Sequence, residues 1–273
     1  MTVTTFARVA AAAILSVIGA VTLAGRVLIS VEDEIALGRE AQKQVRAEVP
    51  QVGDRLVVSY VAAIGRRLAR HAGGPRYPYS FSVADHREIN AFALPGGPVW
   101  IHRGAIRAAA TEGQLAGVLA HEVAHVAERH SAEQLTKGLI ASGLLGLLGA
   151  MLGNEGGART AQASAQVLAS GYMLKFSRDD EREADRVGAQ IMRRAGWDPR
   201  EMIVFMETLR RRQGGDPGSV AVFLSSHPVP AERADRLRAA LKGTSGGRRD
   251  SAQFQRVKRR LAAMPPARPM RRP

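Results

Sequence analysis

The chain has 273 residues, of which 45% are hydrophobic, and this is enough to bury the core of one large domain. The net charge is +14, but ten basic residues against one acid from Lys242 onward carry most of the excess, so the body is only mildly basic and a nucleic-acid-binding domain is not indicated. The absence of cysteine excludes disulfides, thiolate metal sites and a lipid-modified cysteine, and leaves histidine, aspartate and glutamate to hold any metal.

The chain begins with a targeting segment. Residues 1–30 carry one early basic residue, Arg8, followed by an uncharged run over 9–25 that is rich in alanine, valine, isoleucine and leucine. Such a run is typical of an export signal, and 17 uncharged residues also approach the lower limit for a membrane-spanning helix. We predict either a cleaved signal peptide or an N-terminal membrane anchor. Both place the body of the chain on the non-cytoplasmic side.

Two helices and a small sheet are predicted next. Acidic residues in the first turn indicate a helix over 31–50, and apolar residues at helical spacing predict a second one over 54–71. The pattern then changes to short alternating runs over 79–83, 90–93 and 99–102, which predict a small, mostly antiparallel sheet. An edge of this sheet could pair with an extended peptide substrate, or the strands could only support the helix that follows.

A zinc-protease signature lies in that next helix. His121 and His125 are four residues apart and share a helix face, so both can bind one metal ion, while Glu122 stands beside it as a general base toward the attacking water. Three fixed letters can arise by chance, so the surrounding sequence has to agree. Thr111 followed by Gln114 fits a capping box, and the apolar stripe after it predicts a helix that contains the motif.

A second uncharged run covers 139–153. Fifteen residues are too few to span a bilayer comfortably, so the run predicts a buried or interfacial helix. A glycine-rich break follows over 153–157, and residues 158–173 are again helical in composition.

The third ligand of the metal has to be a carboxylate. A metzincin pattern would need glycine at 128 and histidine at 131, but glutamate and serine stand there. The acidic helix start over 177–185 offers five carboxylates, of which Glu181 and Asp185 share a face, so one could bind zinc while the other orients a ligand histidine. Spacing alone does not choose between Glu181 and Glu183, and a solvated acidic helix start is the alternative.

Four ordered motifs resemble metallopeptidase family forty-eight, which includes the CAAX prenyl endopeptidases, HtpX-type quality-control proteases, mitochondrial Oma-type proteases and bacterial periplasmic relatives. They are NAFALPGG at 90–97, HEVAH at 121–125, EREAD at 181–185 preceded by Ser177 and Arg178, and SHP at 226–228. The resemblance covers residues 31–262 and is greatest to the soluble or singly anchored periplasmic forms. It implies an α+β, mainly α-helical fold of the zincin-like, gluzincin kind, with the small sheet beside the HExxH helix.

The resemblance also implies the site residues. One Zn²⁺ per chain is expected on His121, His125 and Glu181, with Glu122 as base and with Asp185 and Arg233 behind the ligands. His227 could steady the oxyanion or occupy the open zinc position as a gate, and both readings stay open. The other histidines are left outside the catalytic set, although His130 lies close enough to the metal helix to orient a ligand.

The C-terminal stretch divides in two. Residues 254–261 predict a last amphipathic helix, which falls inside an expected metallopeptidase domain over 31–262. Residues 263–273 are rich in proline and arginine and predict a disordered tail. Its charge would attract anionic lipid head groups and allow association with a membrane surface, but a solvated tail is the favoured interpretation.

The prediction is a zinc endopeptidase of the bacterial cell envelope, in the periplasm or at the outer face of the inner membrane. Its expected substrates are polypeptides, and its expected role is the quality control of misfolded or misassembled envelope proteins. Nucleic acid is not expected as a partner. The alternative is an assembly factor or holdase with a structural zinc site and little proteolysis, which binds client proteins through residues 139–153. Neither the oligomeric state nor the cleavage preference is encoded in a recognisable pattern.

Overall fold

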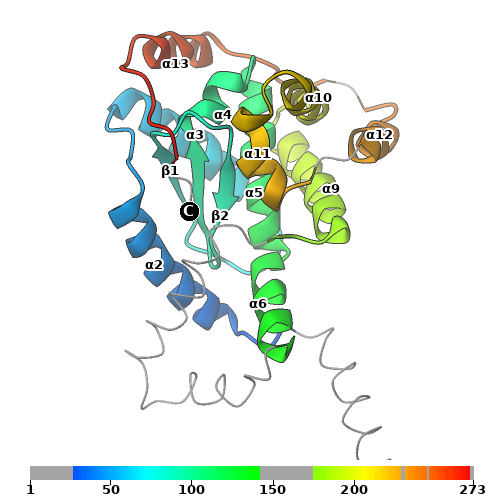
Figure 1. Cartoon of the computed structure of the whole chain (residues 1–273). Helices are drawn as coiled ribbons and strands as arrows, with labels where there is room; N and C mark the ends of the chain where they lie inside the picture. Colours follow the sequence, from blue (N-terminus) through cyan, green and yellow to red (C-terminus); the bar gives the residue numbers. More distant parts are fainter. Residues whose placement is uncertain (1–26, 142–174, 229–230, 245, 271–273) are drawn as a thin grey trace, which may run out of the picture.

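The computed structural model describes residues 27–141, 175–228, 231–244 and 246–270. These residues form a mainly helical fold around one small sheet, as predicted (Figure 1). The predicted targeting segment lies outside the described residues as far as residue 26, as do the apolar run beyond residue 141 and the helix predicted over 158–173. Among the described helices, none combines the length and the apolar character needed to cross a membrane.

The first two helices lie where the sequence predicts them. α2 (Val31–Glu48) begins after Ser30, whose side chain accepts a hydrogen bond from the backbone of Asp33 at 3.1 Å. α3 (Arg55–Ala69) begins after Asp54, which caps the helix through the backbone N–H of Val57 at 3.1 Å. Such caps satisfy backbone donors that the first helical turn leaves free.

The sheet has the strand order β1-β3-β2, with β1 (Ser80–Ala84), β2 (Ala91–Ala93) and β3 (Pro98–His102). β2 and β3 form an antiparallel hairpin, whereas β1 and β3 run parallel, so the sheet is mixed where a mostly antiparallel one was expected. Every residue of β3 is buried, as expected of a central strand. Its hairpin with β2 occupies one edge of β3, so β1 pairs with the other edge, where it runs in the same direction as β3.

The hairpin between β2 and β3 depends on two glycines. Gly96 and Gly97 have φ angles of 69° and 123°, which side chains rarely adopt. A Cβ added to Gly96 would also lie 2.5 Å from the Cα of Ile35 in α2. The turn therefore needs glycine for its backbone conformation and for its close contact with α2.

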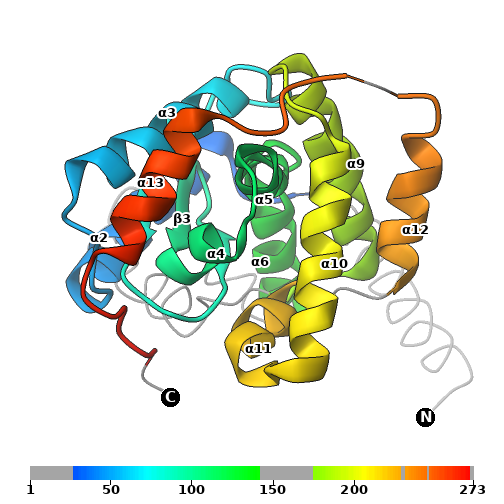
Figure 2. The ribbon, with the colours of Figure 1, turned by 90° about the horizontal axis from the view of Figure 1, so that it is seen from above.

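The helix with the HExxH motif is the centre of the fold. All residues of α5 (Glu112–Ala127) are buried, and Figure 2 shows it end-on among α3, α4, α9 and α10. The hydroxyl of Thr111 accepts the backbone N–H of Gln114 at 3.2 Å, but the Gln114 side chain binds the N–H of Ala110, so only half of the expected capping box forms. Burial on all sides holds both histidines in a rigid frame.

The other helices follow in chain order. They are α4 (Arg103–Ala108), α6 (His130–Ala141), α9 (Arg178–Arg194), α10 (Arg200–Gly215), α11 (Pro217–Ser226), α12 (Ala231–Ala240) and α13 (Ala252–Ala262). A complete capping box between Ser177 and Asp180 starts α9, which was predicted at this place, and α13 matches the predicted last amphipathic helix.

A buried carboxylate ties the start of α5 to the C-terminal part of the chain. Glu112 accepts hydrogen bonds from the hydroxyl of Tyr60 at 2.6 Å and from the indole N–H of Trp197 at 2.8 Å. The hydroxyl of Ser251 donates to the same carboxylate, and Arg248 Nη1 lies 3.3 Å from it. The network joins α3, α5 and the segment before α13, and it satisfies a charge that would otherwise be costly to bury.

Residues 263–270 differ from the disordered tail that their composition predicted. Arg103 donates to the carbonyl of Pro265 at 2.7 Å, and the backbone of Arg268 exchanges hydrogen bonds of 3.0 Å with Asp85 and Arg87. Proline-rich and arginine-rich composition is typical of disorder, but it does not show that a loop after β1 supplies backbone partners. Residues 271–273 lie outside the described part of the chain.

Candidate metal centre

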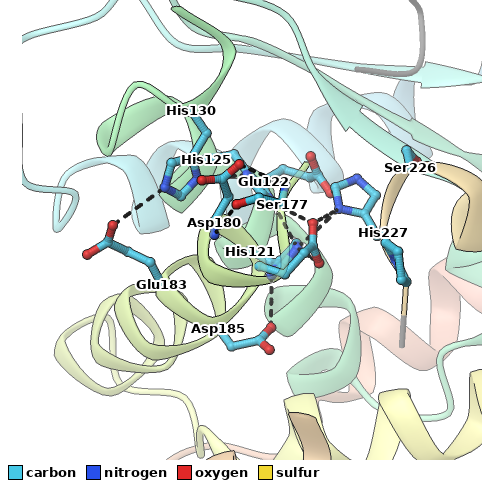
Figure 3. A network of polar contacts seen from close by, with 12 residues as sticks. His121, Glu122, His125, His130, Ser177, Asp180, Glu183, Asp185, Ser226 and His227 are labelled. Atoms are coloured by element: carbon cyan, nitrogen blue, oxygen red, sulfur yellow. Dashed lines mark hydrogen bonds and ion pairs between the residues drawn. The ribbon is translucent and has the colours of Figure 1, made fainter. Parts of the chain in front are cut away.

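Four side chains from three elements meet beside the sheet. His121 and His125 come from α5, and His227 directly follows α11 (Figure 3). Glu181 lies in the first turn of α9. All four are buried, and one potential ligand atom of each lies within 4.8 Å of all the others.

Three of these side chains form a triangle of donor atoms. The Nε2 atoms of His121 and His125 are 3.0 Å apart, and oxygens of Glu181 lie 3.5 Å and 3.4 Å from them, respectively. In a tetrahedral zinc site with bonds of about 2.0–2.2 Å, neighbouring ligand atoms are about 3.3 Å apart. Two imidazole nitrogens and a carboxylate oxygen are also a donor set that zinc accepts. The residues therefore fit one zinc ion in both chemistry and spacing.

The position of Glu183 differs from that of Glu181. Its side chain is 43% exposed, and its Oε2 lies 3.6 Å from Nε2 of His130 (Figure 3). The structure therefore brings Glu181, and not Glu183, to the two histidines, a choice that spacing along α9 left open.

His227 lies at the fourth corner of the donor set. Its Nδ1 is 3.4 Å from Nε2 of His121 and 2.8 Å from Oε1 of Glu181. The ring is 1% exposed and stacks on Phe223 of α11, with centroids 4.9 Å apart. A second aromatic ring, Phe176, stacks on His125 at 4.0 Å. Neither phenylalanine was predicted as part of the site, because an isolated aromatic residue in a sequence does not indicate which ring it will pack against.

An ion pair stands behind the donor set. Nδ1 of His121 lies 3.1 Å from Asp185, and Arg233 binds Asp185 through two hydrogen bonds of 2.7 Å. Arg233 also pairs with Glu181 and donates to the carbonyl of Pro228 at 2.6 Å. One buried guanidinium thus balances two buried carboxylates.

The electrostatics of the cluster favour a cation. Burial lowers the pKa of His121, but the hydrogen bonds and charges of Asp185 and Glu181 outweigh burial and raise this pKa to about 10. Burial also raises the pKa of Glu181, but the charge of His227 and hydrogen bonds from the histidines hold it well below its usual value. Burial holds the pKa of His125 well below its usual value. Glu181 is therefore ionised and His125 neutral, which are the protonation states that metal ligands need, whereas a bound metal ion would have to displace a proton from His121.

Glu122 is completely buried next to the cluster. Neither of its carboxylate oxygens has a hydrogen bond of ordinary geometry within the described residues, and Nε2 of His227 lies 3.6 Å from its Oε1. Burial raises its pKa, against smaller opposing effects from His227, His121 and the backbone of Ala93 in β2. An unpartnered buried carboxylate is costly to keep, and it has lone pairs free to accept a proton.

Comparison with known proteins gives consistent results. The sequence model described as peptidase family M48 matches residues 56–241. The chain is 35% identical over 218 residues to the beta-barrel assembly-enhancing protease of Escherichia coli, which covers 78% of this chain and 44% of that protein. It is 32% identical over 211 residues to the mitochondrial metalloendopeptidase OMA1 of Schizosaccharomyces pombe, with 75% and 60% covered. The chain spans less than half the length of the first of these relatives.

Proposed function

The chain belongs to peptidase family M48, and on that premise we propose that it is a zinc-dependent endopeptidase, with its peptidase domain over residues 31–262. The observation that carries the proposal is the triangle of donor atoms from His121, His125 and Glu181 beside the unpartnered carboxylate of Glu122. A structural zinc site does not need a buried base next to the metal, whereas a zinc site that hydrolyses peptide bonds does.

Each residue has a distinct part in the proposed reaction. Zinc, when bound, would supply Lewis-acid polarisation of the scissile carbonyl and would lower the pKa of the attacking water. Glu122 takes a proton from that water and passes it to the leaving amine. Asp185 accepts the Nδ1 hydrogen of His121 and so keeps Nε2 available as a ligand, while Arg233 holds Asp185 and Glu181 in place.

Polypeptides are the proposed substrates, and the bacterial cell envelope is the proposed location. The name of the E. coli relative, beta-barrel assembly-enhancing protease, and the expected export segment support quality control of misfolded or misassembled envelope proteins. The basic C-terminal part would add an attraction to anionic membrane surfaces. The alternative is an assembly factor or holdase that binds clients with little proteolysis.

Casein hydrolysis by the purified chain is expected to stop when a chelator removes the metal, and to return when zinc is added back, because the ligands alone cannot activate water. Release of labelled peptides measures the rate. Hydrolysis that continues at full rate in chelator would contradict a metal-dependent reaction. Binding of unfolded casein by the zinc-loaded chain without cleavage would instead favour the holdase.

We propose further that His227 acts as a gate. A catalytic zinc keeps one position open for water or substrate, and Nδ1 of His227 lies at that corner of the donor set. An oxyanion stabiliser would instead face the substrate oxygen and leave this corner free. Cleavage would therefore require the segment after α11 to move His227 away from His121 and Glu181.

His227→Ala is expected to raise the rate of casein cleavage, because the fourth position is then accessible without that movement. The same peptide-release assay measures it at equal zinc loading, with His71→Ala as a control distant from the cluster. A fall of about 10²–10³-fold in rate would instead show that His227 stabilises the oxyanion.

A further inference from the structure

His130 is a buried histidine that contacts His125 on the side opposite the donor set. Nδ1 of His130 lies 2.9 Å from Nδ1 of His125, and His130 is 1% exposed. Beyond it, Nε2 of His130 lies 3.6 Å from Oε2 of Glu183 on α9 (Figure 3). A row of three groups therefore runs from His125 through His130 to Glu183.

The contact between the two rings has two tautomeric forms. A distance of 2.9 Å between two neutral imidazole nitrogens requires one hydrogen between them. If His130 donates it, the hydrogen of His125 stands on Nε2, and that nitrogen has no lone pair for a metal. If His125 donates it from Nδ1, its Nε2 keeps a lone pair that faces His121 and Glu181. Only the second form lets His125 bind a metal ion.

Glu183 favours that second form. In it the hydrogen of His130 stands on Nε2, toward the carboxylate, whereas the first form turns a lone pair toward the same negative charge. The distance of 3.6 Å is too long for a good hydrogen bond, and Glu183 is partly in solvent. Its influence is therefore smaller than that of the direct contact between the rings.

The backbone before His130 is held in a conformation that permits this contact. α5 ends at Ala127, and Arg129 has a φ of 63°, the only positive value among the described residues other than glycine. Arg129 donates to buried Glu34 of α2 at 2.8 Å and to the carbonyl of Ile29 at 2.5 Å. These bonds stabilise the turn, and α6 then starts at His130, against the ring of His125.

We propose that His130 is a positioning residue of the metal site. It accepts the Nδ1 hydrogen of His125 and so sets the tautomer and the ring orientation with which His125 faces the metal. Asp185 has the corresponding part for His121, so one ligand histidine is oriented by a carboxylate and the other by an imidazole. The inference rests on the proposed zinc site and adds a residue to it.

His130→Leu removes the hydrogen-bond acceptor and puts an apolar side chain of similar bulk in its place. It is expected to weaken zinc binding by about 10–100-fold, measured by competition with a chromophoric chelator. His130→Asn can place an amide oxygen near the position of Nδ1, so it should restore most of the affinity. The thermal unfolding of each metal-free variant shows whether the fold itself has changed, and His86→Asn controls for the loss of a buried histidine that does not contact the cluster.

Zinc affinity of the leucine variant equal to that of the wild-type chain would overturn the inference. An asparagine variant as weak as the leucine variant would also overturn it, because packing and not the acceptor would then matter. If the leucine variant does not fold, His130→Ala replaces it in the same comparison. A wild-type chain that binds no zinc would contradict the proposed function itself, which keeps the two failures distinct.

Discussion

Glu122→Gln is expected to lower the rate of casein hydrolysis by about 10²–10⁴-fold, the usual contribution of a general base. The substitution keeps the shape of the side chain but removes its ability to take a proton. Glu122 does not belong to the triangle of donor atoms, so zinc affinity should stay close to that of the wild-type chain. The neutral amide also removes a buried charge without a hydrogen-bond partner, so the variant should unfold at the same temperature or a higher one.

The comparison with Glu128→Gln separates catalysis from general effects. Glu128 is exposed directly after α5, and its substitution should leave both hydrolysis and zinc binding unchanged. Hydrolysis at the wild-type rate by the Glu122 variant would show that another group accepts the proton. Loss of zinc from that variant would show that Glu122 is a ligand and not a base.

Glu181→Gln is expected to weaken zinc binding by more than about 100-fold, beyond the usual effect of residues that only orient ligands. The amide removes the negative charge that zinc would share with His121 and His125, and it leaves Arg233 with one buried carboxylate partner instead of two. Metal content after dialysis and the chelator-competition affinity measure the loss. Casein hydrolysis should fall with the zinc content and recover in part at high zinc concentration.

Glu183→Gln is the matched control, because the sequence of α9 offers both glutamates at similar spacing. Its exposed side chain should have at most a minor influence on zinc affinity, transmitted through His130. If Glu183→Gln lost zinc while Glu181→Gln kept it, the proposed ligand assignment would be wrong.

The sequence alone predicts the features that depend on local periodicity and local capping. Four-residue spacing places His121 and His125 on one face of a helix, and that helix forms. First-turn acids and apolar residues at helical spacing likewise predict the helices that form as α2 and α3, because each signal lies within the helix that it describes. The family membership expected from the four ordered motifs is likewise confirmed by comparison with known proteins.

Only the tertiary structure decides which residues from distant segments come into contact. It brings Glu181 rather than Glu183 to the histidines, places Nδ1 of His227 at the fourth corner, and turns His130 against His125 through the unusual backbone of Arg129. It also pairs β1 with β3 in parallel and forms the backbone hydrogen bond from Arg268 to Asp85. Periodicity fixes which face of an element a residue occupies, but the distance between two faces depends on how buried side chains pack over the whole fold.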